Sequence, residues 1–164
     1  MKSVRMALLA LLASAGLLRA EEMGNLTEYS QSGDRYLFRS GACVLAVTAY
    51  TDRIFRVELF PDGTILPDSS AVVAIPPHPP IYFDAFADSQ HFDLLTIGAA
   101  INVNFFPVRF TGVGADGAYA ENARFFWTDS TRGVRFNLSS GESIYGGGER
   151  ALALNRRGQR LESY

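Results

Sequence analysis

The chain has 164 residues, of which 48% are hydrophobic and 20% charged, an ordinary composition for one globular domain with a sizeable core. Without its first 20 residues it keeps 12 basic and 17 acidic side chains, a net charge of −5. Nucleic-acid binding draws much of its affinity from neutralising phosphates, so this acidic balance argues against nucleic acid as a partner.

Residues 1–20 have the pattern of a secretory signal peptide. Two basic residues precede the 13-residue apolar run "MALLALLASAGLL", and small residues follow it. A transmembrane anchor is the alternative, but it needs about 20 apolar residues, and Arg19 interrupts the run too early. We therefore expect cleavage after Ala20, or alternatively after Ala15, export to the periplasm or the extracellular space, and no membrane span after cleavage.

A polar lead-in, "GNLTEYSQSGD", comes after the predicted signal peptide. After it, apolar and polar residues alternate with period two, which predicts antiparallel strands. The three predicted strands are 35–40, 43–50 and 53–60. In the third, Phe55, Val57 and Leu59 face one way and a mixed set faces the other, which is typical of a half-buried strand. The single cysteine, Cys43, has no histidine or cation near it in sequence and is interpreted as a core residue rather than a nucleophile.

The proline-rich stretch "AIPPHPPIYF" at 74–83 predicts a connection between strands, and a proline-motif ligand is the less favoured alternative. The β pattern then resumes at 91–98, 100–106, 108–112, 123–130 and 133–139. The glycine-rich "GVGADGAYAENA" is predicted to form turns. Many short strands spaced by turn signals predict an all-β protein, an antiparallel β-sandwich or a barrel.

Metal binding and nucleophilic catalysis have little support in the sequence. A metal site built from His78 and His91 with Asp84 or Asp88 is conceivable, but the spacing matches no short ligand motif. No serine lies in a nucleophile-elbow pattern, so a Ser-His-Asp triad is not indicated. The "FFW" at 125–127 offers rings that stack on sugars, although most aromatics at alternating strand positions belong to the core. We expect no metal and no cofactor.

The segment 143–164, "SIYGGGERALALNRRGQRLESY", combines glycines with arginines. Gly146, Gly148 and Ala151 fit the dinucleotide pattern G-x-G-x-x-A, but no βαβ unit surrounds them. A P-loop would need a G-K-[ST] ending, and "NRRGQR" is flanked by glutamates, so neither a phosphate loop nor a nucleic-acid patch is favoured.

This segment resembles the junction motif of glycoside hydrolase family 31, the α-glucosidase and α-xylosidase family, with the pattern Y-G-x-G-E-R…L-N-R-R-G. The matching residues are Tyr145, Gly146, Gly148, Glu149, Arg150, Leu154, Asn155, Arg156, Arg157 and Gly158. Upstream, "YTDRIFRVELF" and "LLTIGAAINVNFFPVRFTGVGADG" resemble the family's amino-terminal domain more loosely, so the resemblance covers about residues 35–164. Gly147 departs from the family, which usually has a larger apolar residue there.

The resemblance implies that residues 21–164 form a galactose-mutarotase-like β-sandwich ahead of a catalytic (β/α)8 barrel. Two aspartates of that barrel catalyse retaining hydrolysis of α-glycosides, and neither aspartate's motif occurs in this chain. We therefore expect an exported fragment truncated before the barrel, without catalytic residues, whose partners are the barrel and an α-linked oligosaccharide or glycoside. The alternative is a stand-alone, non-catalytic carbohydrate-binding module, in which Trp127→Ala or a mutation in the segment 143–164 would abolish sugar binding.

The resemblance also suggests substrate-binding residues near the barrel's mouth. The candidates are Glu149, Arg150, Asn155 and Arg156, of which the asparagine and the arginines can hydrogen-bond sugar hydroxyls. The favoured alternative for each is structural bracing of the loop, in which Glu149 and Arg150 pair with Arg156 or Arg157.

Overall fold

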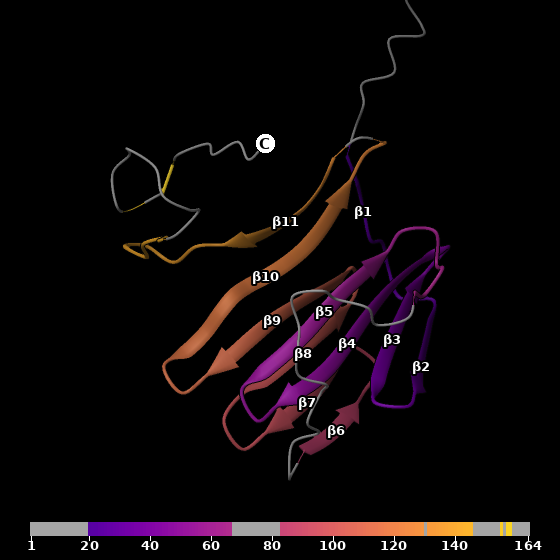
Figure 1. The fold of residues 1–164 in the computed structure, drawn as a ribbon, viewed down its shortest axis with the longest axis horizontal. Coiled ribbons are helices and arrows are strands. Elements are labelled where there is room, and N and C mark those ends of the chain that lie inside the picture. The colour runs from indigo at the N-terminus through magenta and orange to yellow at the C-terminus, as the bar shows by residue number, and fades with distance from the viewer. Residues whose placement is uncertain (1–19, 67–82, 130, 146–154, 156, 159–164) are drawn as a thin grey trace, which may run out of the picture.

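The computed structural model describes residues 20–66, 83–129, 131–145, 155 and 157–158. The predicted signal peptide and the proline-rich connection therefore lie outside the described residues, apart from Ala20 and Phe83 at their ends. The described residues form eleven strands in two antiparallel sheets and no helix, which confirms the prediction of an all-β sandwich (Figure 1).

The smaller sheet has four strands in the order β2-β3-β4-β5. They are β2 (Glu28–Ser32), β3 (Arg35–Ser40), β4 (Cys43–Thr51) and β5 (Ile54–Phe60). The alternation predicted for β5 is confirmed, because Phe55, Val57 and Leu59 pack against the main core while Phe60 packs in a small cluster with Val44 and Ala46. Sequence reasoning missed β2, whose side chains are all exposed; its backbone pairs with β3.

The larger sheet has seven strands in the order β1-β10-β9-β8-β7-β6, with β11 also paired to β10. They are β1 (Glu21–Glu22), β6 (Phe83–Ala87), β7 (His91–Thr96), β8 (Ala100–Phe105), β9 (Val108–Gly114), β10 (Gly117–Trp127) and β11 (Arg132–Asn137). Figure 1 shows β11 on the outer side of β10, away from the body of the sandwich.

The prediction of turns for the glycine-rich stretch is largely wrong, because most of it lies in β9 and β10. Gly112 pairs with Tyr119 across the two strands, and a Cβ atom on Gly112 would collide with the tyrosine ring. Glycine is therefore required here so that the ring can lie across the neighbouring strand. The turn itself is confined to the two residues between the strands.

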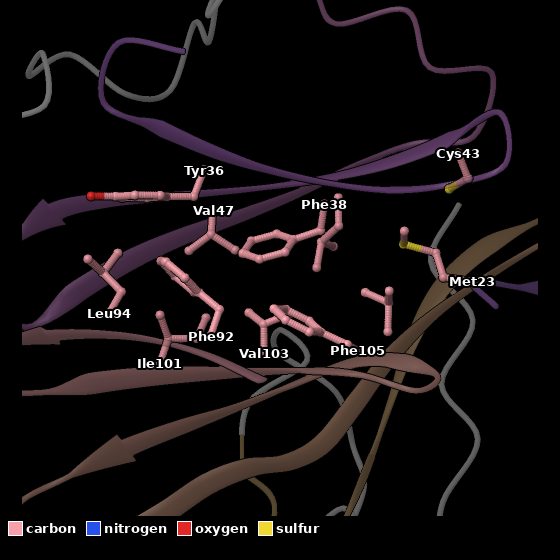
Figure 2. Packing of buried hydrophobic residues seen from close by; sticks show 12 residues of the cluster. Met23, Tyr36, Phe38, Cys43, Val47, Phe92, Leu94, Ile101, Val103 and Phe105 are labelled. Atoms are coloured by element: carbon pink, nitrogen blue, oxygen red, sulfur yellow. The ribbon is translucent and has the colours of Figure 1, made fainter. Parts of the chain in front are cut away.

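The core is a layer of apolar side chains between the two sheets (Figure 2). Phe92 of β7 contacts three rings of the smaller sheet, with centroid distances of 5.4 Å to Tyr29, 4.9 Å to Tyr36 and 5.1 Å to Phe38. Cys43 lies at the edge of this layer and is buried, which confirms its interpretation as a core residue. These rings hold the two sheets together, because burial of apolar surface is the main force that favours folding.

The segment between β1 and β2 is hydrogen-bonded to both sheets. The Leu26 amide donates to the carbonyl of Phe105 in β8 at 2.8 Å, and the Val108 amide donates to the Gly24 carbonyl at 2.9 Å. One residue further along, the Thr27 amide donates to the Arg39 carbonyl in β3 at 2.8 Å. This segment therefore links the larger sheet to the smaller one.

Candidate functional site

Of the four candidate substrate-binding residues, only Asn155 lies within the described part of the chain. Glu149, Arg150 and Arg156 lie outside the described residues, so the ion pairs proposed for them stay predictions. Asn155 is exposed and follows β11 by 18 residues. The site is therefore described through the surroundings of Asn155.

Asn155 connects two parts of the segment that follows β11. Its Oδ1 atom accepts hydrogen bonds from the backbone amides of Ile144, at 3.1 Å, and Arg157, at 3.0 Å. Its Nδ2 atom donates to the Ser143 hydroxyl at 3.0 Å. This carboxamide thus fixes the conformation of the loop, the bracing role that sequence analysis favoured, and its contact with a substrate stays a prediction.

Arg157 extends the same network through backbone carbonyls. Its Nη1 atom donates to the carbonyl oxygens of Ser139, at 3.0 Å, and Glu142, at 2.7 Å. The Glu142 carboxylate in turn accepts from the Ser139 amide at 2.8 Å, which closes a turn just after β11. We refer to residues 139–145, 155, 157 and 158 as the tail. Sequence reasoning missed Ser139 and Glu142, because their contacts with Arg157 use backbone carbonyls and the Glu142 carboxylate binds a backbone amide, none of which leaves a motif in the sequence.

The tail leaves the sandwich beside exposed apolar side chains. Val134 and Phe136 are exposed on β11, and Tyr145 in the tail is 64% exposed. Exposed apolar side chains mark a contact with another domain or protein where they adjoin one another. β11 and the tail, which follow each other in the chain, each carry such side chains.

Ion pairs around Glu22 of β1 hold the adjoining parts of β10 and β11 in place. Its carboxylate lies 3.2 Å from Nε of Arg124 in β10 and 3.0 Å from Nη1 of Arg135 in β11. The Arg135 guanidinium also lies 4.2 Å from the centroid of the Phe126 ring, a cation–π contact. These contacts tie β1, β10 and β11 together.

The "FFW" stretch does not present an open stacking surface. Phe125 and Trp127 pack against the main core, and the Trp127 indole N–H donates to the Glu21 carboxylate at 3.0 Å. Phe126 lies under the Arg135 guanidinium. Because all three rings have structural partners, a loss of sugar binding in Trp127→Ala would not be a clean test of a binding module.

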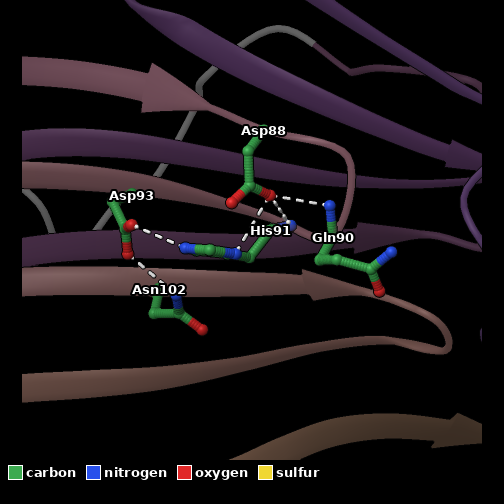
Figure 3. A network of polar contacts seen from close by, with 5 residues as sticks. All are labelled: Asp88, Gln90, His91, Asp93 and Asn102. Carbon is green, nitrogen blue, oxygen red and sulfur yellow. Dashed lines mark hydrogen bonds and ion pairs between the residues drawn. The ribbon is translucent and has the colours of Figure 1, made fainter.

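The histidine considered as a metal ligand belongs to a polar network (Figure 3). His91 Nδ1 lies 3.0 Å from Asp88, and its Nε2 lies 3.3 Å from Asp93, whose carboxylate accepts from Asn102 at 2.8 Å. The backbone amides of Gln90 and His91 donate to Asp88 and hold the pKa of its carboxyl below the ordinary value.

These residues do not make a metal centre. Among the residues that the structure describes, no three histidine, cysteine, aspartate or glutamate side chains are grouped to hold a metal ion. His78, the other histidine of that hypothesis, lies outside the described residues.

The described part of the chain has no helix long and apolar enough to span a membrane.

A shallow depression of about 300 Å³ lies next to this network on the outer face of the larger sheet. Its walls come from the β6–β7 turn, the end of β8, the β8–β9 turn, the start of β9, and β10. The lining residues are Gln90, Asn104, Phe106, Pro107, Arg109 and Asn122. Sequence reasoning missed this feature, because its residues come from four places in the chain and share no motif.

The sequence matches the model of one known protein family. Residues 44–164 match the model of the glycosyl hydrolase 31 N-terminal galactose mutarotase-like domain. No curated protein matches the chain.

Solved structures show the same fold. The GH31 dextranase of Flavobacterium johnsoniae, as a mutant complexed with isomaltotriose, has a TM-score of 0.67 and 19% identity over 85% of this chain and 18% of its own. The cycloalternan-forming enzyme of Listeria monocytogenes, in complex with a pentasaccharide substrate, has a TM-score of 0.62 and 21% identity over 86% of this chain and 14% of its own. The chain thus spans less than a fifth of the length of either structure.

Proposed function

Because the chain belongs to the family of glycosyl hydrolase 31 N-terminal galactose mutarotase-like domains, we propose that it is the N-terminal β-sandwich portion of an exported α-glycoside hydrolase. In this proposal the sandwich is joined to a catalytic barrel, and the tail contributes to the rim of the barrel's active site. The whole enzyme hydrolyses the O-glycosyl bonds of an α-linked oligosaccharide or glycoside by a retaining reaction whose two carboxylates come from the barrel.

The hydrogen-bonded tail is the observation that carries this proposal. The side chains of Asn155 and Arg157 form hydrogen bonds with backbone groups of residues 139–144. These bonds hold the tail in one conformation outside the sandwich core. A loop that orders itself through its own polar groups, directly after β11 and with Tyr145 exposed, is suited to present further residues to a neighbour. The family match extends over the tail, which supports the same role.

Export is proposed from residues 1–20, with their basic start, apolar run and small residues near Ala20. The measurement is the amino-terminal sequence of the mature protein recovered from outside the cytoplasm. We expect it to begin at Glu21, or at Gly16 for the alternative cleavage site. A mature protein that retains Met1 would contradict the proposal of export by cleavage.

The hydrolase proposal is tested with the chain alone and with the chain joined to its barrel. The chain alone should not release the aryl group from aryl α-glucosides or α-xylosides, because no catalytic carboxylate is assigned to it. Enzyme-like turnover by the chain alone that persists through rigorous purification would refute the fragment proposal.

In the barrel-containing protein, Asn155→Ala should lower kcat/KM, because the tail loses the carboxamide that fixes it. Asn155→Asp should be intermediate, since it keeps an acceptor for the two backbone amides and loses the donor to Ser143. Asn137→Ala, at the exposed end of β11, is the matched control and should leave kcat/KM unchanged. Equal behaviour of the alanine variants at 155 and 137 would count against a tail that serves the active site.

A further inference from the structure

We propose that the depression on the outer face of the larger sheet is a binding site for a neutral oligosaccharide, separate from the tail. The inference rests on the proposed function only in the choice of a sugar as ligand. At about 300 Å³ the depression is at the small end of the range of ligand sites, which favours the end of a short oligosaccharide.

The first argument is the supply of unused hydrogen-bonding groups. Within the described part of the chain, the side chains of Gln90, Asn104, Arg109 and Asn122 make no hydrogen bond and no ion pair. Each is planar, and together they offer amide donors, amide acceptors and guanidinium donors. Vicinal sugar hydroxyls, each both donor and acceptor, match such a set, whereas a purely apolar ligand would leave it unsatisfied.

The second argument is an exposed ring at the rim. Phe106 is 54% exposed, although it follows the buried Phe105 and precedes Pro107 in the short β8–β9 turn. An aromatic face covers the apolar C–H face of a sugar ring while the polar groups beside it bind the hydroxyls. Phe106 thus supplies the stacking surface that the "FFW" stretch lacks.

The third argument is the backbone of β10. A β-bulge interrupts its pairing between Tyr119 and Ala123, and within it Ala120 and Asn122 have φ angles of 47° and 51°. This left-handed conformation is strained for Ala120, while asparagine adopts it more readily than most residues, and strained backbone occurs often at binding sites. Here the bulge places Asn122 in the wall of the depression.

The charge around the depression favours a neutral ligand. Arg109 is the only charged residue of its lining, and Asn104 separates it from His91 in register across the sheet. The carboxylates of Asp88 and Asp93 lie on either side of His91 and oppose an anion at this face. In Figure 3 the Gln90 carboxamide points away from that network. The site therefore lacks the cluster of cations that a phosphate or a polyanion would need.

The test is calorimetric titration of the chain with isomaltotriose, maltotriose and, as a charged probe, trigalacturonate. We expect saturable binding of at least one neutral trisaccharide, and binding about tenfold weaker in Phe106→Ala and in Arg109→Ala. Phe83→Ala is the matched control, because this exposed phenylalanine lies at the other end of the β6–β7 hairpin. Its affinity should equal that of the unmodified chain.

Asn122→Gly separates binding from folding. Glycine adopts a positive φ without strain, so the variant should be at least as stable in thermal unfolding and yet bind the sugar more weakly. Unchanged affinity in Phe106→Ala, Arg109→Ala and Asn122→Gly together would overturn the assignment. Absence of saturable binding to both neutral trisaccharides, or tighter binding of trigalacturonate, would also overturn it.

These outcomes differ from those that bear on the proposed function. A chain that binds no trisaccharide would refute this site and leave the proposed hydrolase role standing, because that role depends on the tail and the barrel. Hydrolysis of aryl glycosides by the chain alone would refute the fragment proposal without affecting the titrations of the Phe106 and Arg109 variants.

Discussion

Replacement of Phe92 by alanine tests whether the aromatic layer joins the two sheets. Phe92 has no exposed surface, and its ring contacts those of Tyr29, Tyr36 and Phe38 in the opposite sheet. Truncation of a buried phenylalanine to alanine costs about 3–5 kcal/mol. Ring pairs contribute about 0.5–1.5 kcal/mol each beyond area burial, so the three pairs place Phe92→Ala at the upper end of that range.

The assay is urea unfolding followed by the fluorescence of Trp127, the single tryptophan. A loss of about 4–5 kcal/mol is comparable with the whole stability of a small domain, about 5–15 kcal/mol, so Phe92→Ala should unfold at much lower urea than the unmodified chain. Phe92→Leu keeps most of the apolar volume and should lose less. The control is Phe86→Ala, whose ring is half exposed on β6, and it should change stability by about 0.5 kcal/mol or less.

The reasoning would be refuted by a loss below about 1.5 kcal/mol in Phe92→Ala with an unchanged dependence of free energy on urea, a result outside the range for buried phenylalanines. Equal losses in Phe92→Ala and Phe86→Ala would refute it as well. Should Phe92→Ala fail to fold, Phe92→Leu still decides the question, because it too must be less stable than the unmodified chain.

Three further predictions concern ionisation and close packing. Burial raises the pKa of the Cys43 thiol to about 11, so the unfolded chain releases this proton at lower pH than the folded chain, and stability should fall as pH rises from about 8.5 to 11. In pH-dependent urea unfolding, Cys43→Ala should lack the part of this fall between about pH 8.5 and 10, below the pH at which Tyr29 and Tyr36, whose pKa values burial raises, begin to contribute. Backbone hydrogen bonds lower the pKa of Asp88, so its contribution to the free energy of unfolding is present above the unfolded pKa and should disappear as pH falls below about 4. The free energy of unfolding of Asp88→Ala should therefore depend less steeply on pH in this acid range. Gly112→Ala should displace the Tyr119 ring and cost about 1 kcal/mol, and a double-mutant cycle with Tyr119→Ala should show coupling; additive losses would contradict the packing argument.

Most of the strands could be predicted from the sequence because their two faces differ. The bounds of β3 are the predicted 35–40, and β5 shows the expected division between an apolar face with Val57 and Leu59 and a mixed face. β2 carries no such signal, since all five of its side chains are exposed. The first half of β10 was obscured by Gly117 and by three alanines, which resemble a turn in composition, and the neighbouring β9 carries Gly112, which leaves room for the Tyr119 ring.

Of the tail and the depression, only residues that belong to a local sequence motif could be predicted. The tail motif identified Asn155, but not its partners, because the Ile144 and Arg157 amides act through the backbone. The depression was not predictable, because Gln90, Phe106 and Asn122 are brought together by strand order and by a bulge. Such a feature depends on the register of four strands, which composition and periodicity do not give.

The contacts between the amino-terminal segment and the larger sheet also set an order of folding events. Glu22 pairs with Arg124, 102 residues later in the chain, and Leu26 bonds to Phe105. At a synthesis rate of about 5–20 residues per second, roughly 5–20 s separate the synthesis of Glu22 from that of its partner Arg124 in β10. The smaller sheet, built from neighbouring hairpins, can form meanwhile, so the pairing of β1 with β10 is a late step of folding.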